Sequence, residues 1–410
     1  MLVCQQNNLG HVFIFVMNTA LKDNITGGKC MDFALSKSHR LQQELFQKFA
    51  EEEVKPLARD MDEEEKYSDE LLAKMQKCGF FGIPYSAKYG GAGSDILAYT
   101  LCMEEMSKVC ASTGITLSVH TSLCCACIDE FGNEDQKQAH LRPLVDGSKI
   151  GCFSLTEPDA GSDVANGRSK AVLDGDHYYI TGSKVFTTNS GFADTFIVFA
   201  VTDKSKGARG MSAFIVDGKS EGLEVTPDIP RMGIRAASNA AVTYEKVRVP
   251  AANLLGKEGD GFKIAMRALD GGRIGIAAQS VGIAQGAINE AIKYVKERKQ
   301  FGKKIASFQN TQFKLAELQT MVDAARLMTW RAAVAKDNKE QFGSHAAMAK
   351  LFASEVANQV TRSCVQLLGG YGYTREYSIE RMMRDAKITE IYEGTSEVMK
   401  MVISGGMKLM

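Results

Sequence analysis

The sequence lacks a net charge, because 49 lysine and arginine residues balance 49 aspartate and glutamate residues along its 410 positions. This balance gives no electrostatic basis for broad binding to nucleic acid or to a membrane surface. The sequence also lacks a continuous apolar run near the roughly 18 residues of a membrane span. With 45% hydrophobic and 24% charged residues, it has the composition of a globular protein, and its length predicts two or three packed units.

Histidine is scarce, with six residues in the chain, and this scarcity limits the metal sites that the sequence can form. His120 and Cys124 are four residues apart and would share a helical face, but no further ligands follow at metal-site spacing. The ten cysteines do not form the pattern of a secreted disulfide framework. Cys124, Cys125 and Cys127 occupy an apolar stretch, as reduced core thiols do. We therefore expect a cytoplasmic protein without a bound metal ion.

Several common enzyme signatures are absent as well. No G-x-G-x-x-G follows a predicted strand, and neither a Walker sequence nor a G-x-S-x-G motif occurs. These absences argue against a Rossmann dehydrogenase, a P-loop nucleotidase and an α/β-hydrolase. Residues 1–30 show neither a signal-peptide nor a transit-peptide pattern, so we expect a disordered leader or a mis-called start, with the functional chain beginning near Met31.

The hydrophobic period divides the rest of the chain into three parts. Over residues 31–148, apolar side chains recur at three- to five-residue spacing, which predicts helices. Over residues 149–256, runs such as 196–200 and 211–216 predict the strands of a β domain. Over residues 257–410, helical stripes return and predict a bundle of four long helices, the last in the segment after Glu393. The expected fold is therefore α+β, with an N-terminal helical domain, a middle β domain and a C-terminal four-helix bundle.

Four separated motifs resemble those of the acyl-CoA dehydrogenase family. They are TEPDAGSD at 156–163, GSKVFTTN at 182–189, ERKQFG at 297–302, and the pair QLLGG at 366–370 with IYEGTS at 391–396. The similarity runs from about Met31 to the C-terminus, and the segment around Arg273 is most similar to short-chain, butyryl-type members. The resemblance implies this three-part fold, an FAD between the β domain and the bundle, and a homo-oligomer, usually a tetramer.

The resemblance also implies a set of flavin-binding residues. Thr156 would hydrogen-bond the pyrimidine edge of the flavin, and Thr188 would bond near N5 or O4, where reduction places negative charge. Phe186 stands where many relatives carry tryptophan; it can stack on the ring but cannot donate an indole hydrogen bond. Arg298 matches a residue that reaches the FAD of a neighbouring subunit. The full set is Phe153, Leu155, Thr156, Ser162, Phe186, Thr187, Thr188, Arg298, Phe301, Gln309, Gln366, Leu367, Gly369, Gly370, Thr395 and Glu397.

The catalytic base implied by the resemblance is Glu393, which would remove the α-proton of an acyl thioester while the β-hydride passes to N5 of FAD. Some relatives carry the base instead on the helix where this chain has Gly271 and Gly272, so Glu393 has no competitor there. The substrate contacts implied in the same way are Ser162, Asp270, Arg273 near the CoA moiety, and Gly394.

The expected activity is the α,β-dehydrogenation of a short-chain acyl-CoA, such as butyryl-CoA to crotonyl-CoA, with electrons exchanged with an electron-transfer flavoprotein. The same residues could run the reaction in reverse in an anaerobe through a bifurcating flavoprotein. Two alternatives stay open at this point. An acyl-CoA oxidase would differ in the oxygen reactivity of its reduced form, and a non-catalytic member of the family would purify without bound flavin.

Overall fold

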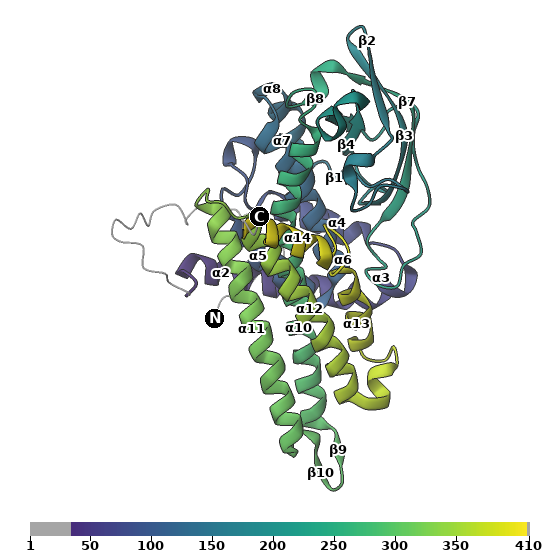
Figure 1. Ribbon diagram of the computed structural model, residues 1–410. Helices are drawn as coiled ribbons and strands as arrows, with labels where there is room; N and C mark the ends of the chain where they lie inside the picture. Colours follow the sequence, from purple (N-terminus) through teal and green to yellow (C-terminus); the bar gives the residue numbers. More distant parts are fainter. Residues whose placement is uncertain (1–33, 408–410) are drawn as a thin grey trace, which may run out of the picture.

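The computed structural model describes residues 34–407, so the expected leader at 1–30 lies outside the described residues. Along the chain, short helices are followed by a sheet and then by a bundle of long helices (Figure 1). This is the α+β order that the hydrophobic period predicts. The sheet lies at one end of the molecule, and the long helices extend away from it.

The N-terminal part consists of short helices around the buried helix α5 (Ile96–Val109). Ser36, Ser68 and Asp95 each begin a helix, because their side chains accept a hydrogen bond from a backbone N–H of the first turn. The other helices of this part are α2 (Lys37–Phe49), α3 (Ala58–Glu64), α4 (Asp69–Lys77), α6 (Ala111–Ser118), α7 (Ala126–Phe131), α8 (Glu134–Gln136) and α9 (Arg142–Val145).

One continuous helical run, Ala111–Phe131, joins α6 to α7 through a π-helical segment, Val119–Cys125. Among the described residues, it is the one helix whose length and hydropathy would suit a membrane span. Its most apolar window is fully buried inside the protein, where it packs against β1 (Gly151–Ser154) and α10 (Gly261–Glu297). Such burial is typical of the core helix of a globular domain.

His120 lies in this core run, and both of its ring nitrogens have partners. Nδ1 accepts from the backbone N–H of Gly151 at 3.1 Å, so Nε2 carries the proton and donates to the Leu144 carbonyl at 3.1 Å. Burial lowers the pKa of His120 to about 3, which keeps the ring neutral. Within residues 34–407, no group of three or more His, Cys, Asp or Glu side chains is arranged to hold a metal ion.

The middle part is an eight-stranded sheet in the order β6-β7-β3-β2-β4-β5-β8, with β1 paired in parallel to β4. The strands predicted from the sequence lie inside β3 (His177–Thr188), β4 (Thr195–Val201), β5 (Met211–Asp217) and β7 (Asn239–Pro250). Four shorter strands were not predicted: β1 (Gly151–Ser154), β2 (Lys170–Asp174), β6 (Leu223–Val225) and β8 (Leu254–Leu255). Each is too short to show a clear period of two.

The C-terminal part contains three long helices, α10 (Gly261–Glu297), α11 (Gln309–Asp337) and α12 (Gly343–Leu368). The helix expected after Glu393 is α14 (Ser396–Gly406), which has 11 residues and is therefore shorter than predicted. A further short helix, α13 (Ile379–Ile388), precedes the Glu393 turn. A small hairpin of β9 (Lys299–Gln300) and β10 (Lys303–Lys304) connects α10 to α11. Near the start of α11, the Phe313 side chain is 59% exposed.

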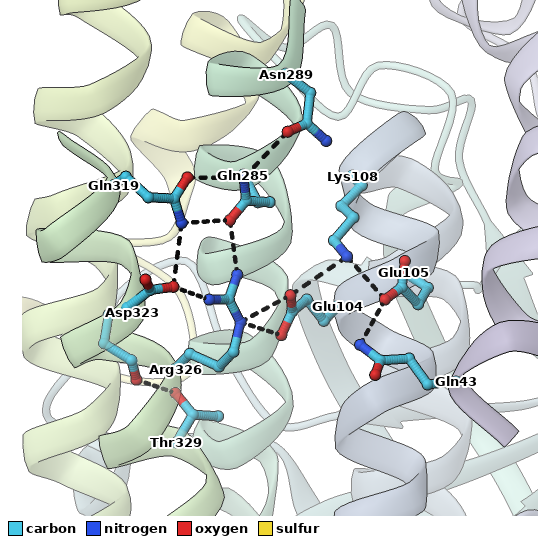
Figure 2. A network of polar contacts seen from close by, with 11 residues as sticks. Gln43, Glu104, Glu105, Lys108, Gln285, Asn289, Gln319, Asp323, Arg326 and Thr329 are labelled. Atoms are coloured by element: carbon cyan, nitrogen blue, oxygen red, sulfur yellow. Dashed lines mark hydrogen bonds and ion pairs between the residues drawn. The ribbon is translucent and has the colours of Figure 1, made fainter. Parts of the chain in front are cut away.

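Helix α10 is central to the molecule, since it packs against α12, α11 and α5. A polar network joins α5, α10 and α11 (Figure 2). In it, Nε of Arg326 donates to both carboxylate oxygens of Glu104 at 3.0 and 3.1 Å, and Nη2 donates to Gln285 at 2.8 Å. Lys108 pairs with Glu105 at 2.7 Å. Because these buried carboxylates have cationic partners, the network connects the bundle firmly to the N-terminal helices.

Candidate active site

Glu393 lies in the tight turn between α13 and α14. Its φ of 53° and the φ of 106° at Gly394 are both in the left-handed region, which a non-glycine residue seldom adopts. Directly after the turn, the Thr395 side chain accepts a hydrogen bond from the Val398 N–H and begins α14. Glu397 is exposed on the first turn of that helix. The turn directs the Glu393 side chain towards α10.

The Glu393 carboxylate lies against α10 at a position without a side chain. A Cβ added at Gly272 would lie 2.1 Å from Oε2 of Glu393 and 2.9 Å from Cδ2 of Leu123. Within the part of the chain that the structure describes, neither carboxylate oxygen has a hydrogen-bond partner. A buried carboxylate without partners is energetically unfavourable, so its free oxygens indicate a group kept available for a ligand.

The electrostatic surroundings of Glu393 suit a general base. Burial raises the pKa of Glu393 to about 7, and the positive charges of Lys350 and Arg273 limit this rise. Arg273 is buried, forms an ion pair with Asp270 at 2.6 Å, and donates from Nε to the Glu393 carbonyl at 3.3 Å. Asp270 and Arg273, predicted as substrate contacts, therefore lie beside the predicted base. A pKa near the working pH is the condition under which a carboxylate transfers protons effectively.

The candidate residues of the β domain form a second part of the site. The Thr156 carbonyl accepts from the Val185 N–H at 2.9 Å, which joins the loop at 155–157 to β3 directly before Phe186. The buried Lys184 secures this loop by donating to the Leu155 carbonyl at 3.0 Å and to Glu157 at 2.8 Å. Phe153, Leu155, Thr187 and Thr188 are buried, Thr156 is half-buried, and Ser162 is exposed.

Two features of this second part suit a flat ligand with polar edges. Phe186 is 60% exposed and has a φ of 58°, so a strained backbone presents an aromatic ring outward. The Thr188 hydroxyl accepts from Nδ2 of Asn239 at 2.9 Å, which leaves its own proton available to a ligand. The buried Oδ1 of Asn239 has no partner among residues 34–407. An apolar surface with a few oriented polar groups is the usual character of a cofactor site.

The remaining flavin-binding candidates lie elsewhere, at the end of the bundle that carries the β9–β10 hairpin. This hairpin is far from β1 and β3 (Figure 1). The Arg298 guanidinium lies over the Tyr371 ring at 5.4 Å, and Phe301 is 92% exposed. A single chain therefore does not bring this group to Thr156 and Glu393. Its members are Arg298, Phe301, Gln309, Gln366, Leu367, Gly369 and Gly370.

Three family models match the chain in the order of its structural parts. The N-terminal, middle and C-terminal domains of acyl-CoA dehydrogenase match residues 36–148, 152–247 and 259–408. The chain belongs to the acyl-CoA dehydrogenase family. A short-chain specific member of this family from Clostridium acetobutylicum is 52% identical over 375 residues, which cover 92% of this chain and 99% of that protein.

Solved structures give the same result. Butyryl-CoA dehydrogenase from Megasphaera elsdenii superposes with a TM-score of 0.91 at 45% identity, covering 92% of this chain and 100% of that one. A chain from a structure described as an electron transferring flavoprotein of Acidaminococcus fermentans has a TM-score of 0.92 at 47% identity and covers 93% of this chain and 100% of its own length. The acyl-CoA dehydrogenase fold thus extends over nearly the whole described chain.

The sequence did not predict three residues that lie around the Glu393 turn. Lys350 donates from Nζ to the Gly394 carbonyl at 2.6 Å, and the Tyr392 hydroxyl donates to Gln279. Gln279 in turn donates to the Ala111 carbonyl at 2.8 Å. A signal for Lys350 was available, since its helical spacing from Ala346 and Ala353 places a charged residue on the buried stripe of α12.

Proposed function

We propose that this protein is a short-chain acyl-CoA dehydrogenase that binds FAD and uses Glu393 to remove the α-proton of a substrate such as butyryl-CoA. The observation that carries this proposal is the buried, unpaired Glu393 carboxylate against Gly272. The relatives described as short-chain specific acyl-CoA dehydrogenase and butyryl-CoA dehydrogenase support the substrate class.

Glu393 would receive the α-proton on one of its two free carboxylate oxygens. The proton leaves more easily when the thioester carbonyl is polarised. The backbone N–H of Glu393 has no other hydrogen-bond partner within residues 34–407, so it can donate to the thioester oxygen. Gly394 leaves room for the substrate beside this N–H. Arg273 and Lys350 keep the two carbonyls of the turn fixed, at 3.3 and 2.6 Å.

FAD, when bound, supplies the hydride acceptor that the protein side chains cannot provide. Thr156, Thr188 and the exposed ring of Phe186 are the residues that would hold the flavin ring, and Phe153 and Leu155 would form the apolar floor. Arg298 and the other residues at the hairpin end of the bundle would bind the FAD of a neighbouring subunit. The separation of the two groups within one chain supports a homo-oligomer, for which we propose a tetramer.

The electron partner in this proposal is an electron-transfer flavoprotein. Support comes from the similar chain in the structure described as an electron transferring flavoprotein, which concerns electron bifurcation. Reversal of the reaction through such a partner is compatible with the same residues. A cytoplasmic location also belongs to the proposal and is supported by the free thiols of Cys78, Cys102, Cys110, Cys124, Cys125, Cys127, Cys152 and Cys364.

The decisive experiment is an anaerobic titration of the flavin-loaded protein with butyryl-, octanoyl- and isovaleryl-CoA, with flavin absorbance as the readout. We expect butyryl-CoA to bleach the flavin most effectively. In Glu393→Gln, the amide keeps the shape but cannot accept the proton, so bleaching should slow by several orders of magnitude while FAD content is retained. Near-normal flavin bleaching in this variant would show that another residue is the base. A wild-type protein whose flavin no acyl-CoA bleaches would refute the proposed activity.

A further inference from the structure

Lys350 is a fully buried lysine in the N-terminal half of α12. Its Nζ donates to the Gly394 carbonyl at 2.6 Å, and within residues 34–407 no carboxylate lies within ion-pair distance of it. A buried ammonium group without a direct counter-ion destabilises a protein unless nearby charges and hydrogen bonds compensate. Its presence on an otherwise alanine-rich core face therefore calls for a functional explanation.

Glu393 is the first of the charged groups that act on Lys350. Burial lowers the pKa of Lys350 to about 8, and the Glu393 carboxylate opposes this effect more than Glu390 or Glu397 does. Glu390 forms its own ion pair with Lys387 at 2.6 Å, and Glu397 is exposed. Lys350 and Glu393 are thus two buried opposite charges joined through the Glu393–Gly394 turn.

The other cation near Glu393, Arg273, has a carboxylate partner of its own. Arg273 of α10 is paired with Asp270 at 2.6 Å, so much of its charge is balanced before it acts on Glu393. The remaining titratable groups that sense Glu393 are Tyr99 of α5 and Tyr392, and burial raises the pKa of both hydroxyls, so both stay neutral. Lys350 is consequently the one cation without a carboxylate of its own among these described neighbours.

We propose that Lys350 is a positioning residue that holds the Glu393–Gly394 turn against α12 and keeps the base ionised near neutral pH. The inference rests on the proposed function, because it assigns to Lys350 a role in proton removal by Glu393. Its hydrogen bond fixes a turn whose two residues are both in left-handed conformations. Its charge counteracts the effect of burial on the carboxylate, so that the base remains able to accept a proton.

The test compares Lys350→Met, Lys350→Gln and Lys350→Arg. Methionine removes both the charge and the hydrogen bond, glutamine keeps a donor without the charge, and arginine keeps the charge. The matched control is Asn358→Leu on the same helix, because Asn358 donates to the Ala386 carbonyl at 3.0 Å and supports α13 without any charge. Anaerobic flavin bleaching by butyryl-CoA is measured in each variant from pH 5.5 to pH 9.

We expect the midpoint of the pH–rate profile to move upward by about one pH unit or more in the methionine and glutamine variants, since an opposite charge nearby shifts a carboxyl pKa by about 1–3 units. Arginine should restore the wild-type midpoint at least partly, and Asn358→Leu should lose stability with an unchanged midpoint. If the Lys350→Met variant does not fold, the pH–rate profile of Lys350→Gln tests the inference by itself. Superimposable profiles in wild type and the uncharged variants would make Lys350 a purely structural residue and overturn the inference.

A second readout does not depend on turnover. Infrared difference spectra between acidic and alkaline pH would follow the C=O stretch of the protonated carboxyl group, assigned to Glu393 by its loss in Glu393→Gln. The band should persist to higher pH in Lys350→Gln than in wild type, and equal persistence would contradict the inference. A wild-type protein that acyl-CoA cannot bleach would instead refute the proposed function, so the two failures are distinguishable.

Discussion

Gly272 and Glu393 depend on each other although 121 positions separate them in the chain. The carboxylate occupies the volume that a side chain at position 272 would fill, with Oε2 at 2.1 Å from the missing Cβ. The sequence suggested both positions through the family resemblance. It could not show their contact, nor the supporting hydrogen bonds of Lys350 and Tyr392, because these arise only when α10, α12 and the turn before α14 pack together.

Gly272→Ala should therefore impair catalysis much more than folding. The added methyl group must displace the carboxylate, and a shift of about 1 Å at a reacting group can slow a reaction by about a hundredfold. Gly271→Ala is the matched control, because its Cβ would approach Nζ at the end of the Lys336 side chain, at 2.6 Å, and the nearest backbone atom, the Ser122 oxygen, lies at 3.9 Å. Stopped-flow flavin bleaching should separate the two variants, and equal rates would show that the carboxylate relocates without loss.

The ionisation of Glu393 should also affect stability. Its pKa is raised from 4.5 to about 7 in the folded protein, so the native state retains a proton that the unfolded chain loses between these values. The stabilisation from this group is present below pH 4.5 and is lost as the pH rises through about 7. Relative to wild type, Glu393→Gln should gain up to about 3 kcal/mol in free energy of unfolding across that window. Urea denaturation at pH 4.5 and pH 7.5 would measure this change, and a pH-independent difference would contradict the raised pKa.

At the scale of the elements, helix α10 packs against helices of both the bundle and the N-terminal part. Its glycines allow the backbone of α5 to come close to it. A Cβ at Gly282 would lie 2.4 Å from the Glu104 carbonyl oxygen, and one at Gly286 would lie 2.2 Å from that of Lys108. The helical period predicted α10 itself but not this contact with α5, because hydropathy does not reveal which face of a fully buried helix meets a backbone. The π-helical segment Val119–Cys125 was not predicted either. Its hydrogen bonds join residues five apart instead of four, and this difference leaves little trace in the hydrophobic pattern of the sequence.

Gly286→Ala should move α10 away from α5 and lower the free energy of unfolding by about 1–3 kcal/mol, because a backbone carbonyl cannot rotate away as a side chain can. Gly405→Ala on the exposed helix α14 is the control, since nothing lies within 4 Å of its added Cβ. There alanine should stabilise the helix by about 0.5–1 kcal/mol. Chemical denaturation of both variants would show opposite signs, and a neutral Gly286→Ala would mean that the α5–α10 contact is adaptable.

For the whole molecule, the three-part architecture was predictable because it follows from a change of hydrophobic period along the chain. The arrangement of the proposed cofactor site was not predictable in the same way. Thr156 and Thr188 lie near β1 and β3, whereas Arg298 and Gly370 lie at the hairpin end of the bundle (Figure 1). A pattern in one sequence cannot distinguish residues that meet within a chain from residues that meet between two copies.

Arg298 allows a test of the proposed oligomer, in which residues of two subunits bind the same FAD. It is exposed, and its guanidinium lies over the Tyr371 ring at 5.4 Å, so it is accessible for its proposed role of binding the diphosphate of a neighbouring subunit's FAD. Arg298→Ala would remove a charge-assisted contact of roughly 1.5–3 kcal/mol and weaken FAD binding by about ten- to a hundredfold. Because a ligand bound across an interface stabilises that interface, the oligomer should also dissociate more readily.

Arg298→Lys should restore binding only partly, since an ammonium group cannot form the two parallel hydrogen bonds of a guanidinium. Light scattering and flavin absorbance on one gel-filtration run measure both effects. An alanine variant that keeps its flavin and its size at low protein concentration would show that Arg298 is a solvent-exposed residue without a role in assembly.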